Sequence, residues 1–291
     1  MRTKKINKLW NKIILILTVV GISLVVLGGL LGGQPGGLQG TTILGMPGNN
    51  LQFVPISNMG SFVLFPGSNN RSNTVVGTEP VVSRTFQLNE FNAINVGGSS
   101  NVIFRQSDNY SVTIEMPENL FEYVNMDRAV RGSTLHLIPF KPGIGVNFNR
   151  HSPRIYIYAP NLESVSFSGA VTGVGWDSIY AENFRLNLSG STSIDLQVYT
   201  DNLQVTSSGA SRLTLSGRAD TSNIRASGSV RIEAFDLDMR ESRVTASGSS
   251  RVNTFVSEHL NASSSGSSRI TYRGNPTTNI RSTGSSRVVS D

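Results

Sequence analysis

Apolar or small residues alternate with polar ones through the carboxy-terminal half of the chain, with a two-residue period. One such series of apolar and small positions is Leu203, Val205, Ser207, Gly209, Ser211, Leu213 and Leu215. Alternation of this kind predicts β-strands with one buried face. Helical periodicity is almost absent beyond the first thirty residues, so the pattern indicates an all-β protein.

A glycine returns every 18 to 21 residues within this alternation: Gly169, Gly190, Gly209, Gly228, Gly248, Gly266 and Gly284. Self-similarity at this period is typical of a solenoid. A coil of about 20 residues accommodates three strands of about 5 to 6 residues with bends between them. Successive coils would then stack strand on strand, which predicts a parallel β-helix.

The alternation places each repeated glycine on the inward face. We expect the coil to bend sharply there, with the opposite wall so close that no side chain fits. No glycine-rich phosphate loop precedes a helical pattern, so we expect these glycines to be structural.

The amino-terminal segment predicts a membrane anchor. An uncharged apolar run of 19 residues, 13–31, follows five basic residues: Arg2, Lys4, Lys5, Lys8 and Lys12. The run is long enough to span a bilayer, and its basic flank predicts a cytoplasmic amino terminus. A cleaved signal peptide is the alternative, but its apolar core is usually about 7 to 15 residues and no clear Ala-x-Ala site follows. We therefore expect one retained transmembrane helix within 1–32.

Composition divides the remainder into a linker and a head. Residues 33–83 are rich in Gly, Pro, Asn and Ser, which predicts a flexible linker. We expect the β-helical head to occupy 84–291. Its stretch 110–160 departs from the period and predicts less regular coils with inserted hairpins. The strands expected there are Ser111–Met116, Thr134–Pro139 and Arg154–Tyr158.

Charge and residue types exclude several classes of partner. The chain carries a formal net charge of +6. Because the five amino-terminal cations supply most of that charge, the head has no broad basic excess of the kind that nucleic acid requires. The chain has no cysteine. The three histidines, His136, His151 and His259, lack metal-ligand spacing, so no cofactor and no metal site is expected.

Arginine follows each glycine by three residues from Gly209 onward, at Arg212, Arg231, Arg251, Arg269 and Arg287. If the register holds, these side chains stack at about 4.8 Å, where like charges repel by somewhat under about 1 kcal/mol per pair in water. They either splay into solvent and pair with carboxylates such as Glu233, or form an anion-binding stripe. The forked guanidinium donors suit sulfated, carboxylated or phosphate-containing polymers.

An enzymatic alternative has few candidate residues. Parallel β-helices also carry polysaccharide lyases and hydrolases, which gather carboxylates or basic groups in one groove. Asp236 and Asp238, which flank Leu237, are the nearest approach to a carboxylate pair. We expect them to belong to a solvated turn.

The order of motifs resembles the head GIN domain family of bacterial surface adhesins over residues 84 to 290. The resemblance rests on an opening Phe91-x-x-Ile94-x-Val96-Gly-Gly-Ser, a Leu-His-Leu-Ile strand, Ala159-Pro-Asn-Leu-Glu163, repeated Ser-Gly-Ser and a closing Ile270-Thr-Tyr-Arg-Gly-Asn-Pro276. It implies a right-handed β-helix exposed at the envelope and no catalytic residues.

Together these features predict a membrane-anchored, extracytoplasmic binding or structural module without catalysis. Its expected ligands are glycans or anionic envelope polymers, such as acidic polysaccharide or cell-wall polymer. A polysaccharide-active β-helical enzyme is one alternative, and an envelope-stress or signalling accessory protein is another. Unpaired strand edges at the ends of a solenoid favour pairing with other chains, so self-association through the solenoid ends is also expected.

Overall fold

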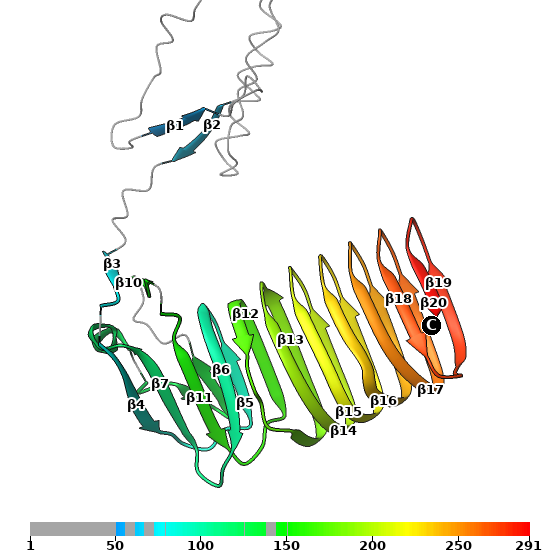
Figure 1. Cartoon of the computed structure of the whole chain (residues 1–291), viewed down its shortest axis with the longest axis horizontal. Coiled ribbons are helices and arrows are strands. Elements are labelled where there is room, and N and C mark those ends of the chain that lie inside the picture. The colour runs from blue at the N-terminus through cyan, green and yellow to red at the C-terminus, as the bar shows by residue number, and fades with distance from the viewer. Residues whose placement is uncertain are drawn as a thin grey trace, which may run out of the picture. The chain divides into compact units, whose positions relative to one another are not determined.

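Long parallel strands stacked one on the next make up the carboxy-terminal part of the protein (Figure 1). The computed structural model describes residues 51–55, 62–66, 73–78, 80–124, 126–137, 144–149 and 151–291. The expected anchor at 13–31 lies outside these residues, as does most of the expected linker at 33–83. Within the described residues, no helix has both the length and the apolar character needed to cross a membrane.

The chain separates into two units, Met1–Ser72 and Asn73–Asp291. In the first unit, β1 (Leu51–Pro55) and β2 (Phe62–Pro66) pair as an antiparallel hairpin. The second unit holds the strands from β3 (Asn73–Val76) to β20 (Arg287–Ser290) and contains the functional candidates.

The regular coils are stacked in parallel register. They comprise β12 (Ser164–Gly173), β13 (Ile179–Gly190), β14 (Ser193–Ser207), β15 (Arg212–Ala226), β16 (Arg231–Ala246), β17 (Arg251–Ser264), β18 (Arg269–Arg273), β19 (Thr277–Ser282) and β20. Each strand from β12 to β18 pairs in parallel with a strand of the following coil. The expected all-β parallel solenoid is confirmed. Three short strands per coil were expected, but β14 to β17 are each one long, bent strand of 14 to 16 residues.

The amino-terminal end of this unit is less regular, as the sequence predicts. There, β4 (Val81–Gln87) pairs antiparallel with β7 (Ser111–Pro117), which pairs antiparallel with β11 (Arg154–Ala159). Parallel pairing resumes between β11 and β6 (Ser99–Gln106). The remaining elements are η1 (Glu118–Tyr123), β5 (Ala93–Val96), β8 (Val130–Arg131), β9 (Thr134–Leu137) and β10 (Ile144–Asn147). The three strands expected between 110 and 160 are present as β7, β9 and β11.

The core is a continuous column of apolar side chains inside the coils. Leu213, Ile232, Val252 and Ile270 occupy one register position in successive coils, and each is completely buried. Burial of apolar surface is the main stabilising contribution to a fold of this kind. Each of these side chains packs between its register partners in the previous and the next coil. The apolar positions of the alternating sequence are therefore the residues that fill the core of the solenoid.

The repeated glycines do not face inward, contrary to the sequence prediction. Gly209 and Gly228 are exposed, in a turn that joins the end of one long strand to the start of the next. Gly209 has a φ of +77°, and a Cβ built on it would lie 2.4 Å from the carbonyl oxygen of Gly190 in the preceding coil. Left-handed backbone and close contact with the stacked glycine below therefore explain the repeat.

Candidate functional site

Five arginines begin successive strands of the solenoid at one register position. Arg212, Arg231, Arg251, Arg269 and Arg287 are the first residues of β15, β16, β17, β18 and β20, and each pairs with the next. All five side chains are exposed. The stacking that the sequence predicts is thus confirmed, and we refer to these five residues as the arginine ladder.

A buried residue precedes each ladder arginine, and it is a serine in four of the five coils and Val230 before Arg231. The Ser211 hydroxyl donates to the carbonyl of Ser208 at 2.8 Å, and the Ser250 hydroxyl donates to that of Ser247 at 2.7 Å. Ser268 and Ser286 make the same bond to the residue three positions earlier. Because the serine points into the core and closes the turn, the arginine after it must point outward.

The ladder arginines carry no compensating charge among the described residues. None of them makes an ion pair or a side-chain hydrogen bond there, although six other arginines make ion pairs. Glu233, the carboxylate that the sequence suggested as a partner, accepts a hydrogen bond from Asn253 Nδ2 at 2.6 Å instead. Neighbouring strands lie about 4.8 Å apart, and two unit charges at that separation repel in water by about 0.9 kcal/mol.

A hollow of about 280 Å³ lies along the ladder at its carboxy-terminal end. It is lined by Ser249, Ser250, Arg251, Ser267, Ser268, Arg269, Ser285 and Arg287. Guanidinium groups and hydroxyls together supply several hydrogen-bond donors and a net positive charge. Such a surface can hold sulfate, carboxylate or phosphate groups spaced along a polymer.

The carboxylates that the sequence offered for catalysis lie elsewhere. Asp236 and Asp238 are exposed on β16, on either side of the buried Leu237. They belong to a strand and not to the expected turn. The register places Asp238 beside Arg218 of the preceding coil.

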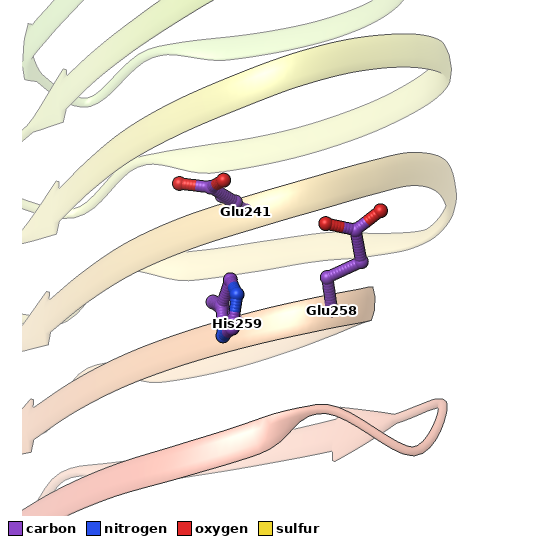
Figure 2. Close-up of side chains that lie close together, drawn as sticks. All are labelled: Glu241, Glu258 and His259. Atoms are coloured by element: carbon purple, nitrogen blue, oxygen red, sulfur yellow. The ribbon is translucent and has the colours of Figure 1, made fainter.

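A second cluster, not foreseen from the sequence, contains Glu241, Glu258 and His259 (Figure 2). Glu241 in β16 and His259 in β17 are register partners in adjacent coils, and Glu258 precedes His259. One ligand atom from each residue lies within 4.8 Å of the others. Carboxylate and imidazole donors are those that Zn²⁺ accepts, so the set is chemically competent for a metal.

An arginine already occupies the space between the two carboxylates. Arg240 Nη1 lies 2.8 Å from Glu241 Oε1 and 3.1 Å from Glu258 Oε2. The hydrogen bond to Glu258, and then the charge of Glu241, raise the pKa of Arg240 above its ordinary value. The guanidinium therefore stays charged and acts as the counter-ion of this surface cluster, and a metal would have to displace it.

Sequence spacing does not reveal this cluster because the coil length varies. The register between β16 and β17 shifts twice, between Ala234 and Asp238 and again between Met239 and Glu241. As a result, Glu241 and His259 pair at a separation of 18 residues, whereas Arg231 and Arg251 in the same two strands pair at 20. His136, in β9, and His151 lie outside this cluster.

Comparison with known proteins supplies a family. A family model described as "Putative auto-transporter adhesin, head GIN domain" matches residues 90–276. A search of curated proteins found no match.

Several solved structures share the fold. A structure described as a putative adhesin from Bacteroides fragilis has 24% sequence identity and a TM-score of 0.69, covering 75% of this chain and 100% of its own. One described as a putative lipid binding protein from Parabacteroides distasonis has 20% identity and a TM-score of 0.63, covering 75% of this chain and 99% of its own. A putative adhesin from Parabacteroides merdae has 20% identity and a TM-score of 0.61, with the same coverages.

Proposed function

The chain belongs to the head GIN domain family of auto-transporter adhesins, and from this premise we propose that it is an adhesin-like binding module that holds an anionic envelope polymer or glycan along the arginine ladder. The proposal places the head outside the cytoplasmic membrane, anchored by 13–31, with the amino terminus in the cytoplasm. We also propose that the solenoid is right-handed, as the resemblance to this family implies.

The observation that carries this proposal is the column of unpaired guanidinium groups. Five like charges in register destabilise the fold through mutual repulsion, and no carboxylate among the described residues offsets them. A polyanion would offset them, since its charges lie along one line as those of the ladder do. The serines of the adjoining hollow add neutral donors to the same surface.

Support for the membrane location comes from the sequence. A 19-residue apolar run preceded by five basic residues has the length and the charge asymmetry of a membrane-spanning helix with its amino terminus inside. An adhesin must be exposed at the surface, which agrees with this topology.

We propose a binding module without catalysis. Polysaccharide lyases and hydrolases need two or more acid–base groups around one substrate bond. The ladder hollow is lined by serines and arginines only. Asp236 and Asp238 do not line it, so the surface proposed here offers binding groups and no carboxylate pair.

The test is equilibrium binding of the full-length protein to heparin, polygalacturonate and polyphosphate, which represent sulfated, carboxylated and phosphate polymers. We expect at least one of them to bind. Replacing Arg231, Arg251 and Arg269 with serine removes three of five ladder charges and is expected to weaken binding by at least about tenfold, or about 1.4 kcal/mol.

A matched control removes the same charge elsewhere. The substitutions Arg128→Ser, Arg131→Ser and Arg281→Ser take away three exposed arginines outside the ladder and its hollow. Equal loss of affinity in both triple variants would mean that only net charge matters, and it would refute the ladder as the site. Absence of binding to all three polymers would refute the proposal as a whole.

A further inference from the structure

Two rows of polar side chains run along the solenoid axis on a surface distinct from the arginine ladder. They come from residues two apart on each strand, with one buried residue between them in every coil except that of β19, where Thr278 is exposed. The first row is Asn183, Asn202, Thr221, Glu241, His259 and Thr277, and the second is Arg185, Gln204, Asn223, Arg243, Asn261 and Asn279. All twelve side chains are exposed or half-buried.

A groove separates these rows. Its two hollows, of about 540 Å³ and about 470 Å³, share Thr221 and Ser222 and so adjoin one another along the solenoid. The hollows extend from Asn92 and Glu163, in the coils before that of Asn183, to the coil of Asn279. We refer to these adjoining hollows, bounded by the two rows, as the polar groove; none of the ladder arginines lines it.

Hydrogen bonds between coils hold the amides of the first row in place. Asn202 Nδ2 donates to Asn183 Oδ1 at 3.0 Å, and the Thr221 hydroxyl donates to Asn202 Oδ1 at 2.7 Å. In the second row, Arg185 Nε donates to Gln204 Oε1 at 3.0 Å. Groups fixed in this way lose little freedom when a ligand binds, which favours affinity.

The same amides keep donors available for a ligand. An amide group has two N–H donors and one carbonyl acceptor. Asn202 uses one N–H toward Asn183, while the amide hydrogens of Asn183 and Gln204 have no protein partner among the described residues. The middle of the groove thus offers repeated donors and acceptors at the spacing of the coils.

The chemistry of this stretch selects the ligand. Asn202, Gln204, Thr221 and Asn223 carry no charge. The charged side chains that line the two hollows are of both signs: Glu163, Arg185, Arg225, Glu241 and Arg243. Because these charges largely offset one another, the groove has no strong preference for a polyanion. Sugar hydroxyls both donate and accept hydrogen bonds, as amides and threonine do. Rungs about 4.8 Å apart, with side chains of each strand about 6.7 Å apart across the groove, suit one extended chain of linked sugar rings.

We infer that the polar groove is a binding site for an extended, uncharged polysaccharide that lies along the solenoid axis. The site uses different residues from the arginine ladder and a different ligand chemistry, so it does not rest on the function proposed above.

The experiment is titration calorimetry of the full-length protein with neutral linear oligosaccharides, from disaccharides to octasaccharides, of the cello-, malto- and manno- series. Affinity is expected to increase with chain length by at least about tenfold and then level off once the groove is filled. Because the ligand carries no charge, the affinity is expected to be nearly the same at low and high salt.

Two variants locate the site. The double variant Asn202→Val, Gln204→Val removes the amides while keeping side chains that favour strands, and is expected to lower affinity at least tenfold. The double variant Asn183→Asp, Asn202→Asp keeps the side-chain shape but removes the amide donors, and is also expected to lower the affinity at least about tenfold. It serves as the test if circular dichroism shows that the first variant misfolds. The ladder variant Arg251→Ser, Arg269→Ser is expected to bind neutral oligosaccharides like the wild type.

Absence of binding to every neutral series would overturn the inference. Unchanged binding in folded groove variants would overturn it equally. Neither result would bear on the polyanion test, in which the ligand is charged and the substitutions lie in the ladder.

Discussion

Each glycine of the repeat stacks on the glycine of the previous coil. For Gly169, Gly190, Gly209, Gly228, Gly248 and Gly266, an added Cβ would lie between 2.4 and 2.9 Å from the carbonyl oxygen of the glycine below. Gly98 begins this column, and a Cβ built on it meets nothing within 4 Å, although its φ is +86°. The column therefore contains two separable reasons for glycine, namely backbone conformation and contact between coils.

These two reasons can be measured by alanine substitution. Gly98→Ala is expected to cost about 1 to 2 kcal/mol, because only the left-handed backbone is strained. Gly209→Ala is expected to cost about 2 to 5 kcal/mol, because the methyl group also displaces the backbone of the coil below. Denaturant unfolding of both variants gives the difference, and equal destabilisation would argue against a role for stacking.

An even number of residues across the turn explains why the sequence pattern predicts an inward position for the glycines. The buried serines Ser207 and Ser211 lie four residues apart on either side of the turn. An even separation preserves the two-residue alternation across the turn, so Gly209 reads as an inward position. Only the φ angle and the exposure of the turn reveal that the strand has ended there.

At the scale of the strand, the register of the arginine ladder was predictable from its constant offset from glycine. The offset places each arginine directly after the turn, where backbone hydrogen bonds between coils hold the register. The Arg231 amide donates to the carbonyl of Ser211, and the Arg251 amide donates to that of Val230. The groups around Glu241 and His259 were not predictable, because bulges in β16 change the spacing of the coil. Sequence reasoning also missed the polar groove, since its rows emerge only when the coils are aligned.

Repulsion within the ladder gives a prediction about stability. Added salt screens exposed charges, so the melting temperature of the wild-type protein is expected to rise with ionic strength. In Arg251→Ser, where the central arginine is removed, the rise is expected to be smaller and the stability at low salt no lower than that of the wild type. Thermal unfolding over a salt series measures both, with Arg225→Ser as the control outside the ladder.

A wild-type melting temperature that does not respond to salt would show that the arginines splay far enough to avoid one another. A lower stability of Arg251→Ser at low salt would show that the side chain stabilises the fold by packing. Either result would remove the energetic argument for a bound polyanion.

At the scale of the whole molecule, the coil of β19 and β20 exposes apolar side chains. Ile280 in β19 continues the column that contains the buried Ala262, yet it is 42% exposed. Val289 in β20 is 39% exposed. Apolar core positions and strand edges without a neighbour favour pairing with another chain, so we propose self-association through this coil with a second copy.

Ile280→Lys is expected to abolish such pairing, because it places a charge where the core of one coil would meet the other copy. Sedimentation of the full-length protein over a range of concentrations measures the effect. Val174→Lys is the matched control. Val174 is similarly exposed, at 47%, but it directly follows β12, several coils away from β19. A wild-type protein that stays monomeric, or association that survives Ile280→Lys, would contradict the proposal.

The arginine ladder as a polyanion site is the central claim, and the salt dependence of polyanion affinity tests it most directly. For binding that releases counter-ions, the slope of log affinity against log salt concentration is about −0.7 to −0.9 for each neutralised charge. We predict a slope of about −4 for the wild type, and of about −1.5 for the protein with Arg231, Arg251 and Arg269 replaced by serine. A slope that is the same in both proteins would contradict the account, because the ladder would then contribute nothing to binding.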